Sequence, residues 1–260
     1  MRLSTLSLLA STATAIPLVP RCNNSTLPPS FFLAGDSTTA TQSPGGGGWG
    51  DGFLNTTLVS GAQGKNFGHN GATTVSFRSG GDWASVLAAA RAALPTSRPH
   101  ITIQFGHNDQ KADKNISMAQ FAANLVRFVD EVRAIPATPV LVTSLSRRTY
   151  KDDANGVPRV VLNLADVVAA TKQAADTSGA AIIDLNAAST AYLNAIGPDD
   201  AHTYNLNPTD NTHLNVAGSV VFGSMVAGLL EGVDGLQGYV RPVAEIETAI
   251  REGVYYFPQQ

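Results

Sequence analysis

Short apolar runs alternate with helical patterns along most of this chain, and the alternation limits the folds that it can adopt. Helices are predicted at Asp82–Leu94, Ser117–Ile135, Val160–Thr177 and Asn215–Leu230. Five runs are predicted strands: Ser30–Ala34, Lys65–Gly68, His100–Gly106, Thr138–Leu145 and Ala180–Leu185. Strands that alternate with helices form βαβ units, so the sequence predicts an α/β fold built on a parallel sheet.

Length and composition indicate one soluble domain. Of the 260 residues, 43% are hydrophobic and 14% charged, which is typical of a single globular domain. The net charge is −3 and there is no basic run, so we expect no nucleic-acid partner, because phosphate binding requires clustered Lys and Arg. We place the domain at residues 30–232 and expect a monomer. A C-terminal tail, residues 233–260, either packs back on the domain or contacts another chain.

The N-terminus has the pattern of a secretory signal peptide. Residues 1–15 contain one early Arg and an apolar stretch of small residues that ends at Ala15. Ser and Thr interrupt this stretch, so it is too polar for a transmembrane helix, and we expect no membrane partner. Residues 16–29 form an N-terminal segment before the domain. The sequence therefore predicts a secreted, extracellular protein.

Cysteine and sequon counts add to this interpretation. The only cysteine is Cys22, so no intrachain disulfide can form, and an unpaired thiol is unusual in a secreted chain. Four sequons would accept glycans in a eukaryotic host: Asn23, Asn24, Asn55 and Asn115. Because such short motifs also arise by chance, they support secretion only weakly.

Polar clusters follow the ends of three predicted strands. Asp36 and Ser37 follow the first strand, Gly71 follows the second, and Asn108 follows the third. In an open parallel sheet, ligands bind at the carboxyl ends of the strands, near the switch in strand order. A fourth cluster, Asp210–Asn215, precedes the last predicted helix and can return to the same edge.

These residue types fit nucleophilic acyl transfer. Ser37 needs a base to activate its hydroxyl, and a histidine that is oriented by a carboxylate supplies one. Asp210 and His213 are three residues apart, so one helical turn or a turn-like loop can present both. The oxyanion needs fixed donors. We expect these to be the Ser37 N–H at the start of a helix, the Gly71 N–H and the Asn108 side-chain amide.

Each residue also has a purely structural explanation. Gly-Asp-Ser is ordinary turn chemistry, and Asp210 can cap the last helix with His213 in its first turn. Asn108 can satisfy loop backbone groups, and His107 can be a packed histidine. The four elements nevertheless occur in this order, with strands before the first three. That joint match favours an active site.

The chain resembles the SGNH (GDSL-like) hydrolases, whose four blocks supply Ser, Gly, Asn and His, and within them the fungal rhamnogalacturonan acetylesterases. The matching motifs are LAGDST (33–38), GGWG (47–50), FGHND (105–109), LVTSLSRRTY (141–150) and DNTHLN (210–215). The resemblance extends from about Phe31 to Leu230. It implies a flavodoxin-like, three-layer αβα fold with a five-stranded parallel sheet.

The resemblance also implies a function and its residues. The nucleophile would be Ser37, with Asp210 and His213 completing the triad and Gly71 and Asn108 completing the oxyanion hole. The protein would be a secreted serine esterase that deacetylates a plant cell-wall polysaccharide, namely the rhamnogalacturonan of pectin, and would need no cofactor. The second block differs, because it reads NGATT where relatives often have Gly-Arg-Ser. Two alternatives stay open: a broad acyl-esterase or lipase with the same triad, and a non-catalytic carbohydrate-binding relative.

Four residues are candidate substrate contacts: Trp49, His107, Arg147 and Arg148. Trp49 is either part of a sugar platform or a buried aromatic anchor. Arg147 and Arg148 either contact an acidic polysaccharide or pair with Asp152 and Asp153. The sequence alone does not separate these alternatives.

Other features carry less weight. The run Gly45–Gly48 lacks the Gly-Lys-Ser/Thr ending of a phosphate loop, so we interpret it as a flexible active-site loop. His202 and Tyr204 either border the pocket or lie in a solvent loop, and His69 and His100 receive no role. We expect no metal site, because no His/Cys cluster has metal-ligand spacing.

Overall fold

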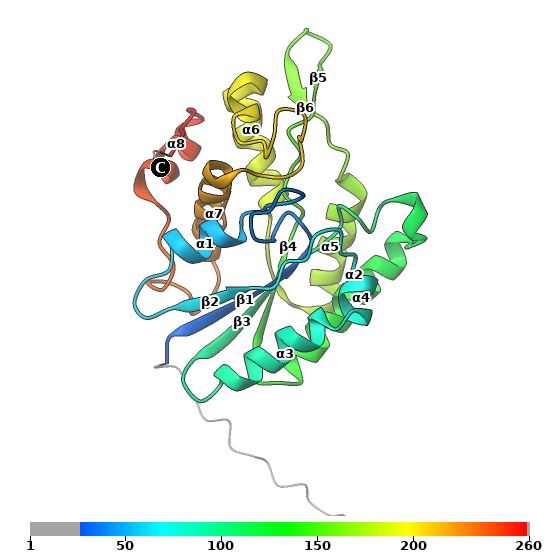
Figure 1. The fold of residues 1–260 in the computed structure, drawn as a ribbon, viewed down its shortest axis with the longest axis vertical. Helices are drawn as coiled ribbons and strands as arrows, with labels where there is room; N and C mark the ends of the chain where they lie inside the picture. The colour runs from blue at the N-terminus through cyan, green and yellow to red at the C-terminus, as the bar shows by residue number, and fades with distance from the viewer. Residues whose placement is uncertain (1–26, 259–260) are drawn as a thin grey trace, which may run out of the picture.

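A computed structural model describes residues 27–258 of the chain (Figure 1). The predicted signal peptide, Cys22 and the sequons at Asn23 and Asn24 lie outside this range. The central sheet has five parallel strands in the order β2-β1-β3-β4-β7. They are β1 (Pro29–Gly35), β2 (Gln63–Asn66), β3 (Arg98–Gln104), β4 (Thr138–Val142) and β7 (Ala181–Ile183). The predicted parallel sheet is confirmed, and its strand order reverses between β1 and β3, as in flavodoxin-like folds.

The strand β1 shows how the sequence divides the core. Successive side chains of a strand point to opposite faces of the sheet. Accordingly, Phe31 and Leu33 belong to one buried apolar cluster, whereas Phe32 and Ala34 belong to a second cluster on the other face. All seven residues of β1 are buried. A strand covered on both faces has a nearly continuous apolar run, which is why this segment is recognisable in the sequence.

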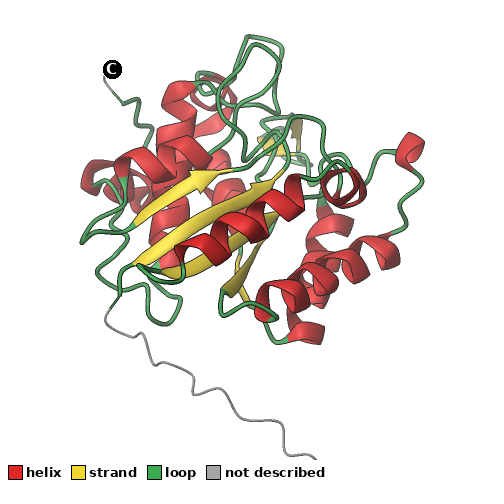
Figure 2. Ribbon diagram, turned by 60° about the horizontal axis from the view of Figure 1, so that its bottom comes forward, coloured by secondary structure: helices red, strands yellow, loops and turns green. Residues whose placement is uncertain are grey.

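Helices cover both faces and complete the predicted three-layer αβα fold (Figures 1 and 2). The cluster of Phe31 is covered by α1 (Gly50–Thr56), α6 (Leu185–His202), α7 (Val216–Leu230) and α8 (Ala244–Glu252). The cluster of Phe32 is covered by α2 (Thr74–Ser79), α3 (Asp82–Ala93), α4 (Met118–Arg133) and α5 (Ala165–Ser178). A short 3-10 helix, η1, spans Ala112–Lys114.

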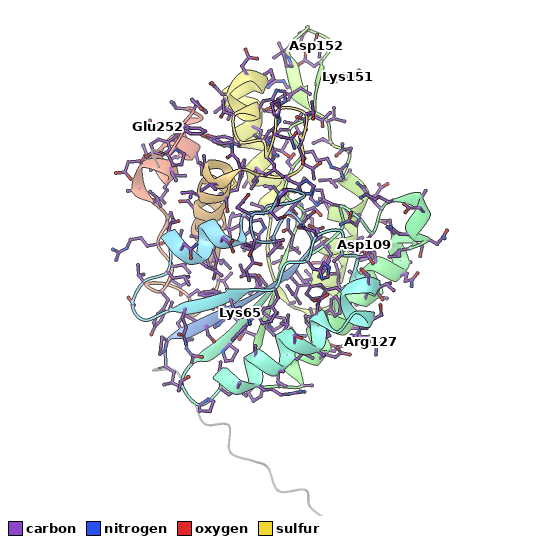
Figure 3. The ribbon with its side chains drawn as sticks, viewed as in Figure 1. Lys65, Asp109, Arg127, Lys151, Asp152 and Glu252 are labelled. Atoms are coloured by element: carbon purple, nitrogen blue, oxygen red, sulfur yellow. The ribbon has the colours of Figure 1, made fainter. Side chains whose placement is uncertain are left out.

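One predicted helix begins later than expected, and one helix, α6, has no counterpart among the predictions. The helix expected from Val160 begins only at Ala165, because β6 (Pro158–Val160) pairs with β5 (Tyr150–Asp152) in an antiparallel hairpin. Figure 3 labels Lys151 and Asp152 on this hairpin, which projects from the body of the molecule. The sequence does not predict α6, because Gly197 and Pro198 interrupt its helical pattern. Gly197 has φ 80° and ψ 173°, which kinks the helix there.

The C-terminal tail packs back on the domain, which was the first of its two predicted alternatives. Leu236, Val240 and Ile246 are buried in the same apolar cluster as Phe31. Their burial explains why α8 lies beside α7 (Figure 1).

Two findings concern the surface of the described range. Asn55 and Asn115 are exposed, as glycan acceptors must be, and their glycosylation stays a prediction. Between residues 27 and 258, no helix combines the length and hydropathy that crossing a bilayer requires.

Candidate active site

Ser37 lies in a tight turn directly after β1. The backbone N–H groups of Thr39 and Ala40 both donate to the Asp36 carbonyl, at 3.1 Å. The turn does not continue into a helix, so our expectation that the Ser37 N–H begins a helix is wrong; α1 starts only at Gly50. A Cβ atom on Gly35 would lie 2.3 Å from Thr39 Oγ1, so the sharp turn requires glycine at this position.

The Asp36 side chain holds this turn in place. Its Oδ1 atom accepts from the Thr38 N–H at 2.9 Å and from the Thr38 hydroxyl at 2.8 Å. Burial by itself would raise the pKa of Asp36, but the adjacent His107 ring and the Thr38 donors lower it overall. The His107 Nδ1 atom lies 3.6 Å from Asp36 Oδ2. A fully buried carboxylate therefore fixes the backbone on which Ser37 is presented.

The structure brings Ser37 into contact with a histidine 176 residues away. His213 Nε2 lies 2.8 Å from Ser37 Oγ, and His213 Nδ1 lies 2.8 Å from Asp210 Oδ2. This is the arrangement in which a carboxylate orients an imidazole and the imidazole deprotonates a hydroxyl. The predicted meeting of these three side chains is confirmed.

Asp210 and His213 are presented by a loop rather than by a helix. Asp210 Oδ1 accepts from the backbone N–H groups of Thr212 at 3.0 Å and His213 at 2.9 Å. The N-cap of α7 is Asn215, which accepts from the Gly218 N–H, so the alternative that Asp210 caps this helix is wrong. Burial would raise the pKa of Asp210, but the hydrogen bonds from His213 and Thr212 lower it overall. Asp210 is thus kept ionised beside the imidazole.

The two further oxyanion candidates line the same cavity as Ser37 and His213, which has a volume of about 380 Å³. Gly71 has φ +76°, and its N–H makes no hydrogen bond within residues 27–258. The Asn108 Nδ2 atom donates to the Ala72 carbonyl at 3.0 Å. This bond ties the loop after β3 to the segment that contains Gly71, so the two donors are held relative to each other.

Two predicted substrate contacts are wrong. Trp49 is fully buried, donates from Nε1 to Gln104 Oε1 at 2.7 Å and packs on Phe53, so it is the buried anchor and not a sugar platform. Arg148 is also fully buried, and its guanidinium donates to Asn205 Oδ1 at 2.5 Å and to the His213 carbonyl at 2.6 Å. Burial lowers the pKa of Arg148 to about 10. It braces the loop of His213 instead of meeting substrate.

The other two candidates, His107 and Arg147, do line the cavity. Lys111 lines it too and is not among the residues predicted from the sequence. Its spacing of three residues from Asn108 is the signal that could have found it, because a turn brings such residues together. Within residues 27–258, no three His, Cys, Asp or Glu side chains form a group that could hold a metal ion.

The remaining histidines and Tyr204 lie elsewhere. Tyr204 is fully buried, and the His202 ring contacts the Arg148 carbonyl at 2.8 Å, so neither borders the cavity. The exposed His69 pairs with Asp82 at 2.8 Å.

Asp109, labelled in Figure 3, makes stability depend on pH. Its carboxylate is fully buried, and Oδ1 accepts from the Thr74 N–H and hydroxyl at 2.9 and 2.6 Å. Burial raises the pKa of Asp109 from 3.8 to about 6. The folded state therefore binds this proton more tightly than the unfolded state. Protonated Asp109 therefore contributes to the free energy of unfolding. This contribution is fully present below about pH 4 and is lost as the pH rises through 6.

We therefore expect Asp109→Asn, which carries no charge to desolvate, to gain stability relative to the wild type as the pH rises. Between pH 4 and pH 8, the difference in free energy of unfolding should shift by about 2–3 kcal/mol in favour of the variant. Urea unfolding at both pH values measures this shift. The exposed Asp113→Asn is the control, because the bond from Lys114 lowers the pKa of Asp113. A difference that does not change with pH would contradict the prediction.

Comparison with known proteins gives a consistent result. The model of the GDSL-like lipase/acylhydrolase family matches residues 33–221. Rhamnogalacturonan acetylesterase RhgT from Bacillus subtilis (strain 168) is 32% identical over 224 residues, which cover 80% of this chain and 91% of the relative. The probable rhamnogalacturonan acetylesterase YesY of the same organism is 28% identical and covers 76% of this chain and 90% of its own.

Solved structures share the fold. A Bacillus subtilis protein, YXIM, superposes with a TM-score of 0.68 at 24% identity, over 79% of this chain and 57% of its own. The acetylxylan esterase Axe2 from Geobacillus stearothermophilus superposes with a TM-score of 0.57 at 18% identity, over 81% of this chain and 97% of its own. At these identities the likeness concerns the fold alone.

Proposed function

The chain belongs to the GDSL-like lipase/acylhydrolase family, and from this premise we propose that it is a secreted serine esterase that removes acetyl groups from the rhamnogalacturonan of pectin. One observation carries the proposal. Ser37 Oγ, His213 and Asp210 are joined by two contacts of 2.8 Å, beside a cavity that Gly71 and Asn108 also line.

The geometry supports a two-step reaction. Ser37 Oγ attacks the acetyl carbonyl carbon while His213 Nε2 takes the hydroxyl proton, and the Asp210 carboxylate stabilises the imidazolium that forms. The N–H groups of Ser37 and Gly71 and the Asn108 amide receive the oxyanion. His213 then returns the proton to the departing sugar oxygen. In the second step, His213 activates a water molecule, which hydrolyses the acetyl-enzyme and frees Ser37.

The lining of the cavity supports an ester substrate that has a short acyl group and a polar alcohol. Among the described residues, every lining side chain beyond glycine carries a polar or charged group, and none is purely hydrocarbon: Ser37, Gly45, Gly71, His107, Asn108, Lys111, Arg147, Thr212 and His213. A lipase requires an apolar channel for its acyl chain, because burying a methylene group is worth about 0.8 kcal/mol. The same residues offer many hydrogen-bonding groups to a sugar. The polysaccharide esterase is therefore favoured over the lipase alternative.

The surroundings of Arg147 support the proposal that the substrate is an acidic polymer. Within residues 27–258, the cavity is lined by Lys111 and Arg147 and by no carboxylate. Lys111 Nζ already donates to Asn108, whereas the buried Nε atom of Arg147 has no partner in the described chain. Burial lowers the pKa of Arg147, and the Asp36 carboxylate partly opposes this. A desolvated guanidinium is well suited to a carboxylate, such as that of galacturonate.

The test is acetate release by purified wild-type and Arg147→Met protein from three substrates: acetylated rhamnogalacturonan, acetylated xylan and the small neutral ester phenyl acetate. We expect the wild type to act on all three, with the highest kcat/KM on rhamnogalacturonan. Arg147→Met should raise KM about tenfold on rhamnogalacturonan, as for the loss of one charge-assisted bond, and leave phenyl acetate unchanged.

Arg127→Met is the matched control, because Arg127, labelled on α4 in Figure 3, is exposed and pairs with Glu131. Equal effects of Arg147→Met on acidic and neutral substrates would discard the acidic polymer and keep the esterase. If the wild type released no acetate from any of the three esters, the esterase proposal would fail and the non-catalytic carbohydrate-binding alternative would remain.

A further inference from the structure

The side-chain amide of Asn108 is held from two sides. Its Nδ2 atom donates to the Ala72 carbonyl at 3.0 Å, and its Oδ1 atom accepts from Lys111 Nζ at 2.7 Å. An amide nitrogen carries two hydrogens. One N–H of Asn108 therefore remains without a partner in the described chain, on a side chain that lines the cavity of Ser37 and His213.

The contact with Lys111 discriminates between the two orientations of this amide. A rotation of 180° about χ2 exchanges the oxygen and nitrogen atoms with little change in shape. The rotated amide would place its oxygen against the Ala72 carbonyl and its NH2 group against the Lys111 ammonium, so that both contacts would become repulsive. In the observed orientation both contacts are hydrogen bonds, and the bond from the ammonium is charge-assisted.

A hydrogen bond to Oδ1 also acts on the opposite end of the amide. A cation at the oxygen draws electron density from the nitrogen and makes the remaining N–H a stronger donor. That N–H is the group proposed to receive the oxyanion. A donor fixed before the reaction, with no competing orientation, stabilises the transition state without reorganisation.

We propose that Lys111 is a positioning residue of the oxyanion hole. Its hydrogen bond fixes the Asn108 amide in the orientation that points the free N–H toward the acyl oxygen. The inference rests on the proposed esterase function, because it concerns the same oxyanion. Lys111 acts through Asn108, and among the described residues it makes no hydrogen bond to Ser37. Its place at the cavity rim offers one other role, a direct contact with a substrate carboxylate, and a neutral ester separates the two roles.

The experiment measures kcat and KM of the full chain on phenyl acetate for the wild type, Lys111→Met, Lys111→Arg and Lys114→Met. Met keeps the apolar stem of lysine and removes the donor, whereas Arg keeps a charged donor. We expect Lys111→Met to lower kcat about tenfold with KM nearly unchanged, as for one charge-assisted hydrogen bond at a partly solvated site. Lys111→Arg should recover most of the loss. Lys114, exposed and paired with Asp113, is the matched control and should have no effect.

A double-mutant cycle shows whether Lys111 acts through Asn108. In an Asn108→Ala background, Lys111→Met should cause no further loss of kcat, because the amide that it orients is absent. The same tenfold loss in both backgrounds would overturn the proposal. So would an unchanged kcat on phenyl acetate together with a raised KM on acetylated rhamnogalacturonan, which would assign Lys111 to the substrate carboxylate.

Measurements on the wild type and on Ser37→Ala distinguish failure of the proposed function from failure of the role proposed for Lys111. If the wild type releases no acetate, or if Ser37→Ala releases as much as the wild type, the esterase proposal fails and the role of Lys111 fails with it. If the wild type is active and Ser37→Ala is not, the outcome of the Lys111 series concerns Lys111 alone. Because Lys111 is exposed, we expect its variants to fold, and a thermal melt checks this.

Discussion

Replacing Ser37 with alanine is expected to lower kcat for acetate release by a factor of at least about 10⁴. The substitution removes the Oγ atom that lies 2.8 Å from His213 Nε2, and no other hydroxyl among residues 27–258 forms a hydrogen bond with that nitrogen. Water could still attack an ester held by the oxyanion donors, which sets the small residual rate. Acetate release from phenyl acetate and from acetylated rhamnogalacturonan measures the loss on both substrates.

Two controls show that this loss is chemical. Within residues 27–258, the Ser37 hydroxyl makes no hydrogen bond besides the one with His213, so the melting temperature of Ser37→Ala should stay within a few degrees of the wild type. Ser85→Ala changes an exposed serine on α3 and should retain full activity. A fluorophosphonate probe should label the wild type and Ser85→Ala but not Ser37→Ala. Retention of wild-type acetate release by Ser37→Ala would reject Ser37 as the nucleophile.

Replacing Arg148 with methionine is expected to lower the free energy of unfolding by about 3 kcal/mol. Methionine fills much of the same volume but donates no hydrogen bonds. Asn205 Oδ1 and the His213 carbonyl would then lose their contacts with the guanidinium. Because one of these contacts supports the loop of His213, we also expect kcat to fall. Urea unfolding measures the first effect, and acetate release from phenyl acetate measures the second.

The neighbouring residue supplies the matched control. Arg147→Met should change the free energy of unfolding by less than about 0.5 kcal/mol, because Arg147 lines a cavity and its Nε atom has no hydrogen-bond partner within residues 27–258. Arg148→Lys should resemble Arg148→Met, since lysine lacks the planar fork that reaches two acceptors at once. A stable Arg148→Met with normal kcat and a raised KM on acidic polymer would instead restore Arg148 as a substrate contact.

Several features of the fold follow from local sequence alone. The run around Phe31 and Leu33 is recognisable because a strand buried on both faces is apolar at successive positions. The helix α4 is equally clear, since Phe121, Leu125 and Phe128 recur with helical spacing and Ser117 caps its first turn at 3.1 Å. Such signals depend on neighbours within one or two turns, so they do not require knowledge of the rest of the chain.

Other elements are hidden from the sequence for physical reasons. The kink at Gly197 divides α6 into two shorter helical segments. The apolar residues of the two segments therefore do not share one continuous helical spacing that could be recognised in the sequence. The hairpin strand β6 has only three residues, too few to compete with the helical pattern that follows it. The sequence predicts that the turn at Ser37 opens a helix, but it does not, because the Asp36 carboxylate accepts hydrogen bonds from Thr38 and closes the turn.

The residue types of the active site and their order along the chain can be read from the sequence. The residue types and spacing of four motifs predict acyl transfer, and these motifs contain Ser37, Asn108, Asp210 and His213. What the sequence could not determine is which side chains share one small volume, because such proximity depends on the packing of segments as far apart as Ser37 and His213.

The roles of the remaining candidates depend on how the chain packs. Arg147 and Arg148 are adjacent and chemically alike, yet one lines the cavity and the other is fully buried behind the His213 loop. The orientation of their side chains is set by the neighbours that each can reach, Asn205 and the His213 carbonyl for Arg148. Residue type fixes what a group can do, but packing and solvent access fix whether it meets the substrate.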